Sequence, residues 1–164
     1  MRITSDIAEV ADPKIRLLHA YWEELRAGRP APARAELDPG RLRAILPYLI
    51  IVQFEREPFR VLYRLVGTRV AEVTGADITG RYLDEVAFRE EADFQGCYLR
   101  AATEAVPVFI TGVLSRDQWS DWTYDAGIFP LSDDGATVNK AIAVETYDRL
   151  ESDPDRLLRL RGGR

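Results

Sequence analysis

Residues 48–54 read YLIIVQF and residues 60–66 read RVLYRLV, and this pair of runs decides the fold class. Both runs are rich in β-branched and aromatic side chains, which are enriched in strands. The residues between them, EREP at 55–58, are typical of a turn. The two runs therefore predict a β-hairpin.

Three more segments with strand-like composition lie towards the C-terminus, at residues 107–116, 118–129 and 137–147. Asp117 marks a tight turn between the first two segments, and the run DDG at 133–135 is a turn signal between the last two. Because short turns join the segments in sequence order, we expect an antiparallel meander.

Helical segments separate the hairpin from the meander. A short helix at residues 69–74 is closed by Gly75, and a longer helix is predicted at residues 89–105. Helices grouped between two blocks of strands are typical of an α+β domain built on one antiparallel sheet. We therefore expect a five-stranded sheet with these helices on one of its faces.

A further helix is predicted near the N-terminus, after Asp12 and Pro13, because Asp is a good N-cap and Pro suits the first helical position. Its apolar residues recur every three or four positions and form one stripe. The stripe consists of Ile15, Leu18, Trp22 and Leu25, widened by Leu17 and Tyr21. It must be buried against the other face of the sheet or against a second chain.

We predict the second arrangement, a homodimer, because large aromatic side chains are common at interfaces. The interface residues are expected to be Leu18, Tyr21, Trp22 and Leu25. The change Trp22→Ala should then weaken association more than it disturbs the fold. The chain as a whole divides into an N-terminal helix and linker at 1–37, the α+β domain at 38–148 and a tail at 149–164.

The order of these elements resembles that of the PAS sensor modules of bacteria. The resemblance covers residues 38–147 and is carried by the hairpin YLIIVQF…RVLYRLVGT, the phrase VTGADITGRYLDEV and the closing three strands. It implies a PAS-like sheet in which the first and last strands are central neighbours. It also implies a pocket between helices and sheet that can hold a small ligand, with signals leaving through flanking helices across a homodimer.

Four residues are candidates for ligand binding in such a pocket. Arg64 interrupts an apolar strand and is a candidate anchor for an acidic ligand, although the pattern favours an edge arginine in solvent or paired with a carboxylate. Alternation places Trp122 and Tyr124 on one face of their strand, where they line the pocket or pack against the N-terminal helix. Tyr82 is the fourth, in the phrase GRYL at 80–83.

Cofactors are not expected. By resemblance, haem-binding PAS domains use a histidine on the helix before the third strand, and residues 89–105 contain none. Flavin photosensors use a cysteine in a Gly-Arg-Asn-Cys phrase, and the matching position here is Leu83. Cys97 lies further along the chain, and its simplest interpretation is a small buried residue. The purified protein should be colourless.

The scarcity of histidine and cysteine disfavours catalysis and metal binding. His19 is the only histidine and Cys97 the only cysteine, whereas a zinc site needs three or four ligands. A nucleophile would have to recruit His19 from the N-terminal helix. The sequence also lacks the common glycine loops that cradle phosphates. An enzyme on a cystatin-like cone, the other α+β possibility, lacks catalytic residues.

The composition indicates where the protein acts. The net charge of -5 disfavours nucleic acid as a partner, since it offers no general attraction to phosphates. There is no signal-like segment and no apolar run long enough to span a membrane, so we expect a cytoplasmic protein. The strong excess of arginine over lysine suggests a GC-rich bacterial genome.

The sequence therefore predicts a bacterial sensory, ligand-binding or protein-interaction module that is not an enzyme. It would pass its signal by contact to a separate signalling protein. The alternative is a structural interaction domain whose interior is filled by its own side chains. A cavity of roughly 300 Å³ or more would favour sensing.

Overall fold

A computed structural model of the chain describes residues 1–86, 93–115 and 121–149. Its centre is an antiparallel six-stranded sheet with the strand order β1-β4-β5-β6-β2-β3. The strands are β1 (Arg2–Thr4), β2 (Leu49–Arg56), β3 (Phe59–Val66), β4 (Val108–Ser115), β5 (Asp121–Leu131) and β6 (Lys140–Arg149).

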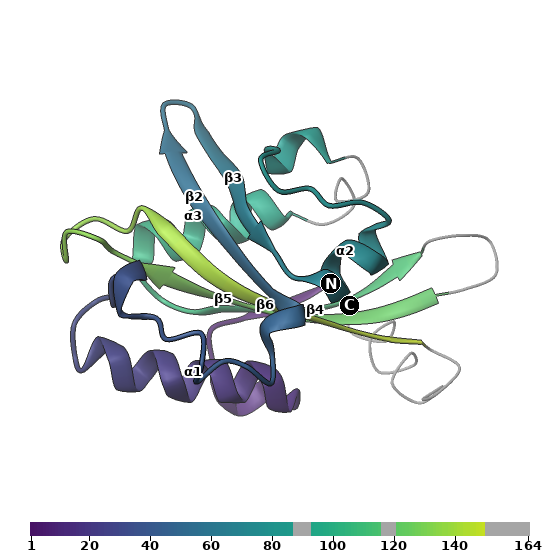
Figure 1. The fold of residues 1–164 in the computed structure, drawn as a ribbon, viewed down its shortest axis with the longest axis horizontal. Helices are drawn as coiled ribbons and strands as arrows, with labels where there is room; N and C mark the ends of the chain where they lie inside the picture. Colours follow the sequence, from purple (N-terminus) through teal and green to yellow (C-terminus); the bar gives the residue numbers. More distant parts are fainter. Residues whose placement is uncertain (87–92, 116–120, 150–164) are drawn as a thin grey trace.

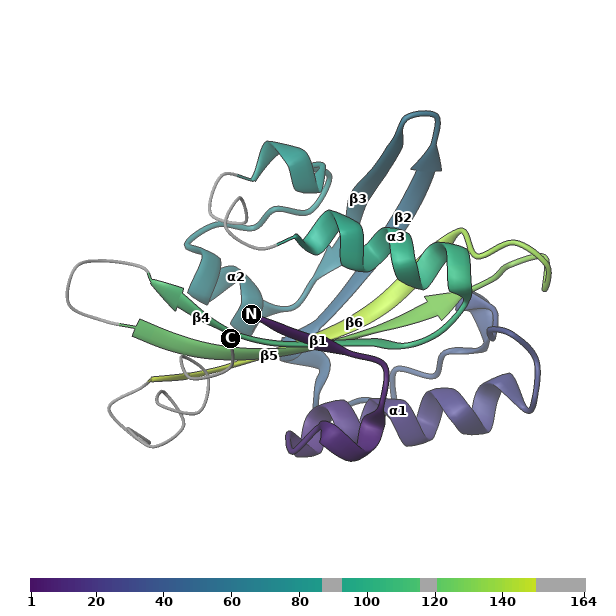
Figure 2. The ribbon, with the colours of Figure 1, turned by 180° about the vertical axis from the view of Figure 1, so that it is seen from behind.

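Among the described residues, three α-helices cover the two faces of this sheet, and Figures 1 and 2 show them as separate layers. The helices are α1 (Pro13–Arg26), α2 (Thr68–Thr74) and α3 (Phe94–Glu104). Helix α1 lies alone on one face, and α2 and α3 lie on the other. Short 3-10 turns connect these elements at Ile7–Glu9, Arg34–Glu36, Leu46–Tyr48 and Leu83–Glu85.

The expectation of one antiparallel sheet in an α+β domain is confirmed. All five predicted strands are present, and the first and last of them, β2 and β6, are central neighbours through pairs such as Ile50↔Ala143. The count is six rather than five because β1 pairs with the edge of β4. Three residues are too few to show an alternating pattern, so β1 was not predicted.

Helix α1 begins as its sequence predicts. The Asp12 carboxylate accepts hydrogen bonds from the backbone N–H groups of Lys14 and Ile15, at 2.7 and 3.0 Å, and Pro13 occupies the first position. The helix ends at Arg26, with Ala27 in the left-handed conformation before Gly28. Both ends of α1 are therefore set by local residues rather than by packing.

Alternation along β5 decides which side chains face which helix. Gly127 faces α1, where an added Cβ would lie 2.8 Å from Cγ2 of Ile15. The Phe129 ring lies on the same side, 6.1 Å from the Trp22 ring between centroids. Tyr124 faces the opposite way, with its ring 5.7 Å from that of Phe94 on α3. The sheet thus separates two apolar layers, which belong to one continuous core.

Candidate functional site

The candidate site lies between α3 and the sheet, on the face opposite to α1. Helix α3 turns Phe94, Cys97, Tyr98 and Ala101 inwards. The Tyr98 ring meets Phe54 of β2, with 6.1 Å between ring centroids, while Phe94 meets Tyr124. Aromatic pairs therefore attach the N-terminal half of α3 to the sheet.

Tyr124 is buried on β5, and its ring rests against the backbone of β4. The residue opposite to it is Gly112, where an added Cβ would lie 2.7 Å from two atoms of the Tyr124 ring system. Only glycine leaves room for the ring in this position. Strand β4 thereby fixes Tyr124 inside the space between α3 and the sheet.

Strand β6 brings a carboxylate to the same face. Glu145 is only 3% exposed and stands opposite Ala126, and Tyr147 stands opposite Tyr124. The Tyr147 hydroxyl donates a hydrogen bond to the Glu145 carboxylate. Because Ala126 and Tyr124 face α3, so do Glu145 and Tyr147. A carboxylate so far from water requires hydrogen-bonding partners, and Tyr147 is one of them.

The other face of β6 is tied to the start of α1. Thr146, between Glu145 and Tyr147 in sequence, donates a hydrogen bond of 2.8 Å from its hydroxyl to Oδ2 of Asp12. Oδ1 of the same carboxylate caps α1. Neighbouring residues of β6 therefore contact the interior on one side and α1 on the other.

Residues 78–86, here called the strap, run along the outer edge of β3. The Gly80 N–H donates to the Tyr63 carbonyl at 2.8 Å, and the Tyr63 N–H donates to the Arg81 carbonyl at 3.0 Å. Beneath the strap, Ile78, Leu83 and Val86 are buried. The strap thus covers an edge that would otherwise expose backbone groups.

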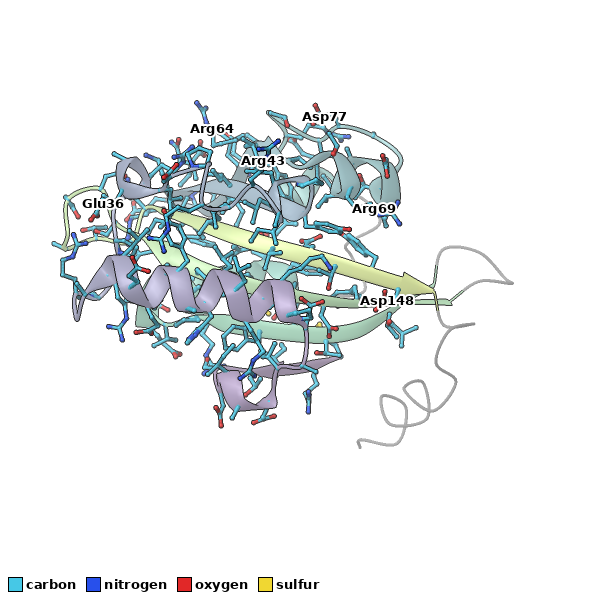
Figure 3. All side chains as sticks on the ribbon, turned by 60° about the horizontal axis from the view of Figure 1, so that its bottom comes forward. Glu36, Arg43, Arg64, Arg69, Asp77 and Asp148 are labelled. Carbon is cyan, nitrogen blue, oxygen red and sulfur yellow. The ribbon has the colours of Figure 1, made fainter. Side chains whose placement is uncertain are left out.

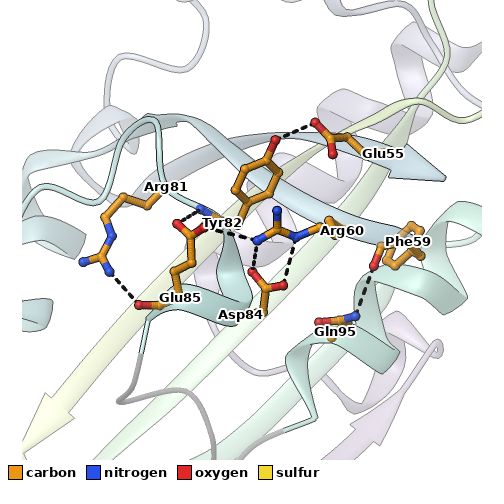
Figure 4. Close-up of polar contacts among 8 residues, drawn as sticks. All are labelled: Glu55, Phe59, Arg60, Arg81, Tyr82, Asp84, Glu85 and Gln95. Atoms are coloured by element: carbon orange, nitrogen blue, oxygen red, sulfur yellow. Dashed lines mark hydrogen bonds and ion pairs between the residues drawn. The ribbon is translucent and has the colours of Figure 1, made fainter. Parts of the chain in front are cut away.

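Arg60 of β3 holds the strap through several contacts that Figure 4 displays. Its guanidinium makes two hydrogen bonds to Asp84, at 2.9 and 2.7 Å, and one to Glu85 at 3.2 Å. It also stacks 3.6 Å from the centroid of the Tyr82 ring. The hydrogen bonds that Arg60 donates to Asp84 and Glu85 raise the pKa of Arg60, and the bond to Arg60 lowers the pKa of Asp84.

The structure places two of the predicted ligand-binding residues outside the interior, which corrects that expectation. Arg64 is exposed at the periphery of the molecule (Figure 3). Tyr82 is on the outer side of the strap, where its hydroxyl donates to Glu55 at 2.6 Å and this bond raises its pKa. Tyr124 lies inside, as described above, and the side chain of Trp122 is outside the described part.

The position of Arg64 has a physical cause. Val52 of β2 pairs with Tyr63, whereas the preceding residue, Ile51, pairs with Leu65. Arg64 is therefore the additional residue of a β-bulge, a feature that interrupts the alternation of faces along a strand.

The stripe on α1 is buried within the chain itself. Trp22 is 2% exposed, and its indole N–H donates a 2.8 Å hydrogen bond to the carbonyl of Pro130 on β5. Leu18 and Tyr21 are also buried, and Leu25 is partly buried against the same core. This corrects the expectation that these four residues form a dimer surface, because their apolar area already contacts the sheet.

His19 lies at the edge of the same layer. Its ring is 6.0 Å from Phe109 and 6.1 Å from Phe129 between centroids, and its Nε2 is 3.9 Å from a Glu23 oxygen. Burial lowers the pKa of His19, which Glu23 partly offsets. His19 therefore belongs to the packing of α1 and does not face the candidate site.

Cys97 is enclosed on the inner face of α3. Burial raises the pKa of its thiol to about 11, so the reactive thiolate is scarce near neutral pH. The side chain behaves as a small apolar residue in this position, in line with its interpretation from sequence.

A shallow cleft of about 520 Å³ opens to solvent beside α2. It lies over the exposed side of this helix and is lined by Val66, Thr68, Ala71, Glu72, Gly75, Ala76 and Asp77. Because this cleft is not the space between α3 and the sheet, its volume does not decide between a ligand pocket and a filled interior.

The described residues give no sign of a metal centre, since they bring together no group of three or more His, Cys, Asp or Glu side chains suited to an ion. In the same residues, no helix has both the length and the apolar character that a membrane span needs.

Glu145, Tyr147 and Phe94 were not among the residues predicted for the site. A glutamate near the end of a strand is usually solvated, so composition alone did not single out Glu145. The alternation AIAVETY at 141–147 was the available signal, because it places Glu145 on the face of Ala141 and Ala143, which are buried.

Solved structures with the same fold include light-oxygen-voltage proteins. An RNA-binding light-oxygen-voltage receptor matches with 15% identity and a TM-score of 0.53 over 80% of this chain, which spans 39% of that one. A light-oxygen-voltage domain studied with a flavin analogue matches with 12% identity and a TM-score of 0.53, over 76% of this chain and 94% of the other. These identities show a common fold and no more.

No curated protein matches the sequence. A family model described as "PAS domain" matches residues 10–136, which include α1 as well as the hairpin, the helices and the first two strands of the meander. This match covers well over half of the chain, and it agrees with the fold. The chain therefore belongs to the PAS domain family.

Proposed function

We propose that this chain is a sensory PAS module that binds a small molecule between α3 and strands β5 and β6, without catalytic activity of its own. The observation that carries the proposal is the hydrogen-bonded pair of the buried Glu145 and the partly buried Tyr147, which faces the same interior as Tyr124 and Phe94. Pockets for small ligands are mostly apolar with a few well-placed polar groups, and this arrangement has that character.

The partners in this proposal are a second copy of the chain and a separate signalling protein, in the bacterial cytoplasm. Membranes and nucleic acid are not included. One structural neighbour is an RNA-binding receptor, so the exclusion of nucleic acid stays a prediction here. The division at residue 37 also stays a prediction, although residues on both sides of it share one core.

Native mass spectrometry of protein purified from its own host tests the proposal. We expect a small molecule that is retained near one per chain and released on denaturation. The matched control is Thr103→Ala, an exposed position on α3, which should retain the same molecule. Protein without any retained molecule in several growth conditions would contradict ligand sensing.

A filled-core interaction domain is the second candidate, and one observation favours it. The Tyr124 ring already contacts Phe94 on one side and the Gly112 backbone on the other, so side chains occupy part of the space that a ligand needs. The domain would then act through its surface alone. Absence of a retained molecule, together with a specific protein partner, would support this candidate.

Cofactor binding through a cysteine adduct does not fit the residues present. Leu83, at the position that corresponds to the photosensor cysteine, is an apolar residue of the strap and is buried. Cys97 is on α3 with its pKa raised. We predict that the purified protein is colourless, with no haem or flavin absorbance between about 350 and 500 nm. A band in that range that survives gel filtration would contradict this prediction.

A further inference from the structure

The turn that precedes β2 presents an arginine and a leucine to solvent. Its backbone hydrogen bonds have an i to i+3 spacing, as in the 2.9 Å bond from the Ile45 N–H to the Leu42 carbonyl. Side chains three positions apart share a face in such a turn, and Leu42 and Ile45 are both buried. Arg43 and Leu46 therefore share another face, which is exposed, and Leu46 is 40% exposed there.

Leu65 of β3 lies beside this turn. The Leu46 carbonyl oxygen is 2.8 Å from the position that a Cβ of Gly67 would occupy, and Gly67 is two residues from Leu65. Leu65 is 43% exposed and pairs with Ile51, which pairs in turn with Ile142 on the α1 side of the sheet. Two exposed leucines therefore lie on neighbouring segments, although leucine is among the residue types most often buried.

Two arginines flank these leucines. Arg64 directly precedes the leucine of β3, Arg43 shares the exposed face of the turn, and Figure 3 shows both arginines in one region of the molecule. Neither guanidinium makes a hydrogen bond or an ion pair with any residue that the structure describes. The nearby Arg41 differs, because it pairs with Glu24 at 2.7 Å. Two positive charges therefore remain available to a partner.

The four residues Arg43, Leu46, Arg64 and Leu65 are called the patch below. We propose that the patch docks an acidic segment of the separate signalling protein, with carboxylates on the guanidinium groups and an apolar side chain on the leucines. A guanidinium holds a carboxylate through two parallel hydrogen bonds, which gives the contact direction as well as strength. Four residues bury little area, so the interface belongs to the weak and transient class.

Charge and polarity together favour this partner over others. The chain has a net charge of -5, so it offers no general attraction to a phosphate backbone or an anionic membrane. A phosphate backbone also has no apolar group for the exposed leucines, whereas an acidic segment with large apolar side chains matches both features. The inference rests on the proposed function only for the existence of a signalling partner.

Photochemical cross-linking in the host tests the inference. The full chain carries the photoreactive residue benzoylphenylalanine in place of Leu65 or, as a matched control, in place of Leu99, which is 42% exposed on α3 at the other face of the sheet. We expect capture of a peptide from another protein at position 65 and not at position 99. Mass spectrometry should show that this peptide is rich in Asp and Glu and contains a large apolar residue.

A synthetic copy of the captured peptide then measures the role of charge. We expect Arg43→Glu/Arg64→Glu to bind it at least about tenfold more weakly than the wild type, and added salt to weaken wild-type binding. The control Arg100→Glu changes an arginine that already pairs with Glu104 on α3, and it should bind as the wild type does. A peptide with lysine in place of its carboxylates should prefer the double variant.

Other occupants of the patch give different results. No captured peptide, capture at both positions, or a peptide without net negative charge would overturn the inference. Capture of a second copy of this chain would assign the patch to a dimer, and capture of RNA or lipid would assign it to that partner, so each of these results also overturns the inference.

Circular dichroism shows whether each variant is folded, and Arg43→Gln/Arg64→Gln, which only removes the charges, serves if the double glutamate variant is not. Unchanged affinity in a folded variant would overturn the inference. Retention of a small molecule in native mass spectrometry is a separate measurement. A retained molecule without a captured peptide overturns this inference alone, and an acidic peptide without a retained molecule overturns only the ligand part of the proposed function.

Discussion

Gly112 determines where the Tyr124 ring can lie. We expect Gly112→Ala to lower the free energy of unfolding by about 1–3 kcal/mol, because the new Cβ needs space that the ring occupies. Urea denaturation measures this cost. In the double variant Gly112→Ala/Tyr124→Leu the ring is gone, so the alanine should cost less there than in the wild-type background. Simple addition of the two single costs would show that the contact is unimportant.

His19 makes stability depend on pH. Its pKa in the folded protein is lowered by burial from an ordinary value of about 6.5. The unfolded chain therefore binds more protons than the folded protein once the pH falls below that range, and stability decreases as the pH falls. We expect the melting temperature to decrease between about pH 7 and pH 5.5.

The control for this prediction is His19→Gln, which cannot titrate. Because the chain has no other histidine, this variant should have a nearly constant melting temperature over the same interval. A slope as steep as that of the wild type would assign the pH dependence to another group.

At the scale of single residues, alternation places Tyr124 on one face of its strand but does not account for the exposed position of Arg64, and Tyr124 as a ligand-binding residue stays a prediction. Strict alternation assumes an uninterrupted ladder, and the bulge between Ile51 and Val52 breaks it. Tyr82 was misplaced for a different reason. Its contacts with Arg60 and Glu55 join segments that are distant in sequence, and a local pattern carries no information about them.

Helix α1 is part of the fold because its stripe is buried on β5 and β6. We expect Trp22→Ala to lower the free energy of unfolding by about 3–5 kcal/mol, since it leaves a cavity beside Phe129 and removes the hydrogen bond to Pro130. Leu17→Ala, on the exposed side of the same helix, is the matched control and should cost less than about 1 kcal/mol. Similar costs for the two variants would contradict the packing of α1.

Elements with strong local signals were predicted well. Helix α1 has its cap and its stripe, and the five longer strands have their composition and turns. The stripe of α1 was predicted to contact a second chain, although an apolar stripe fits a sheet of the same chain equally well. Gly127 has no Cβ, and this lets Ile15 approach the sheet closely.

For the whole molecule, a homodimer stays a prediction, but its contact surface is not the stripe of α1. Leu17 is 41% exposed on the outer side of that helix and is the better candidate for a contact. We expect sedimentation equilibrium to show a dimer at micromolar concentration and Leu17→Glu to weaken it at least about tenfold. A wild-type monomer under these conditions would end the dimer prediction, and a dimer unaffected by Leu17→Glu would place the contact elsewhere.

The pairing of β2 with β6 also affects how the chain is made. The ribosome releases β2 early, whereas its neighbour in the centre of the sheet begins only at Lys140. At synthesis rates of about 5–20 residues per second, the β2–β3 hairpin waits on the order of ten seconds with one edge unpaired. During that interval an apolar strand is open to wrong partners, and contacts so distant in sequence are slow to form. We therefore expect chaperones to bind nascent chains of this protein until β6 is released.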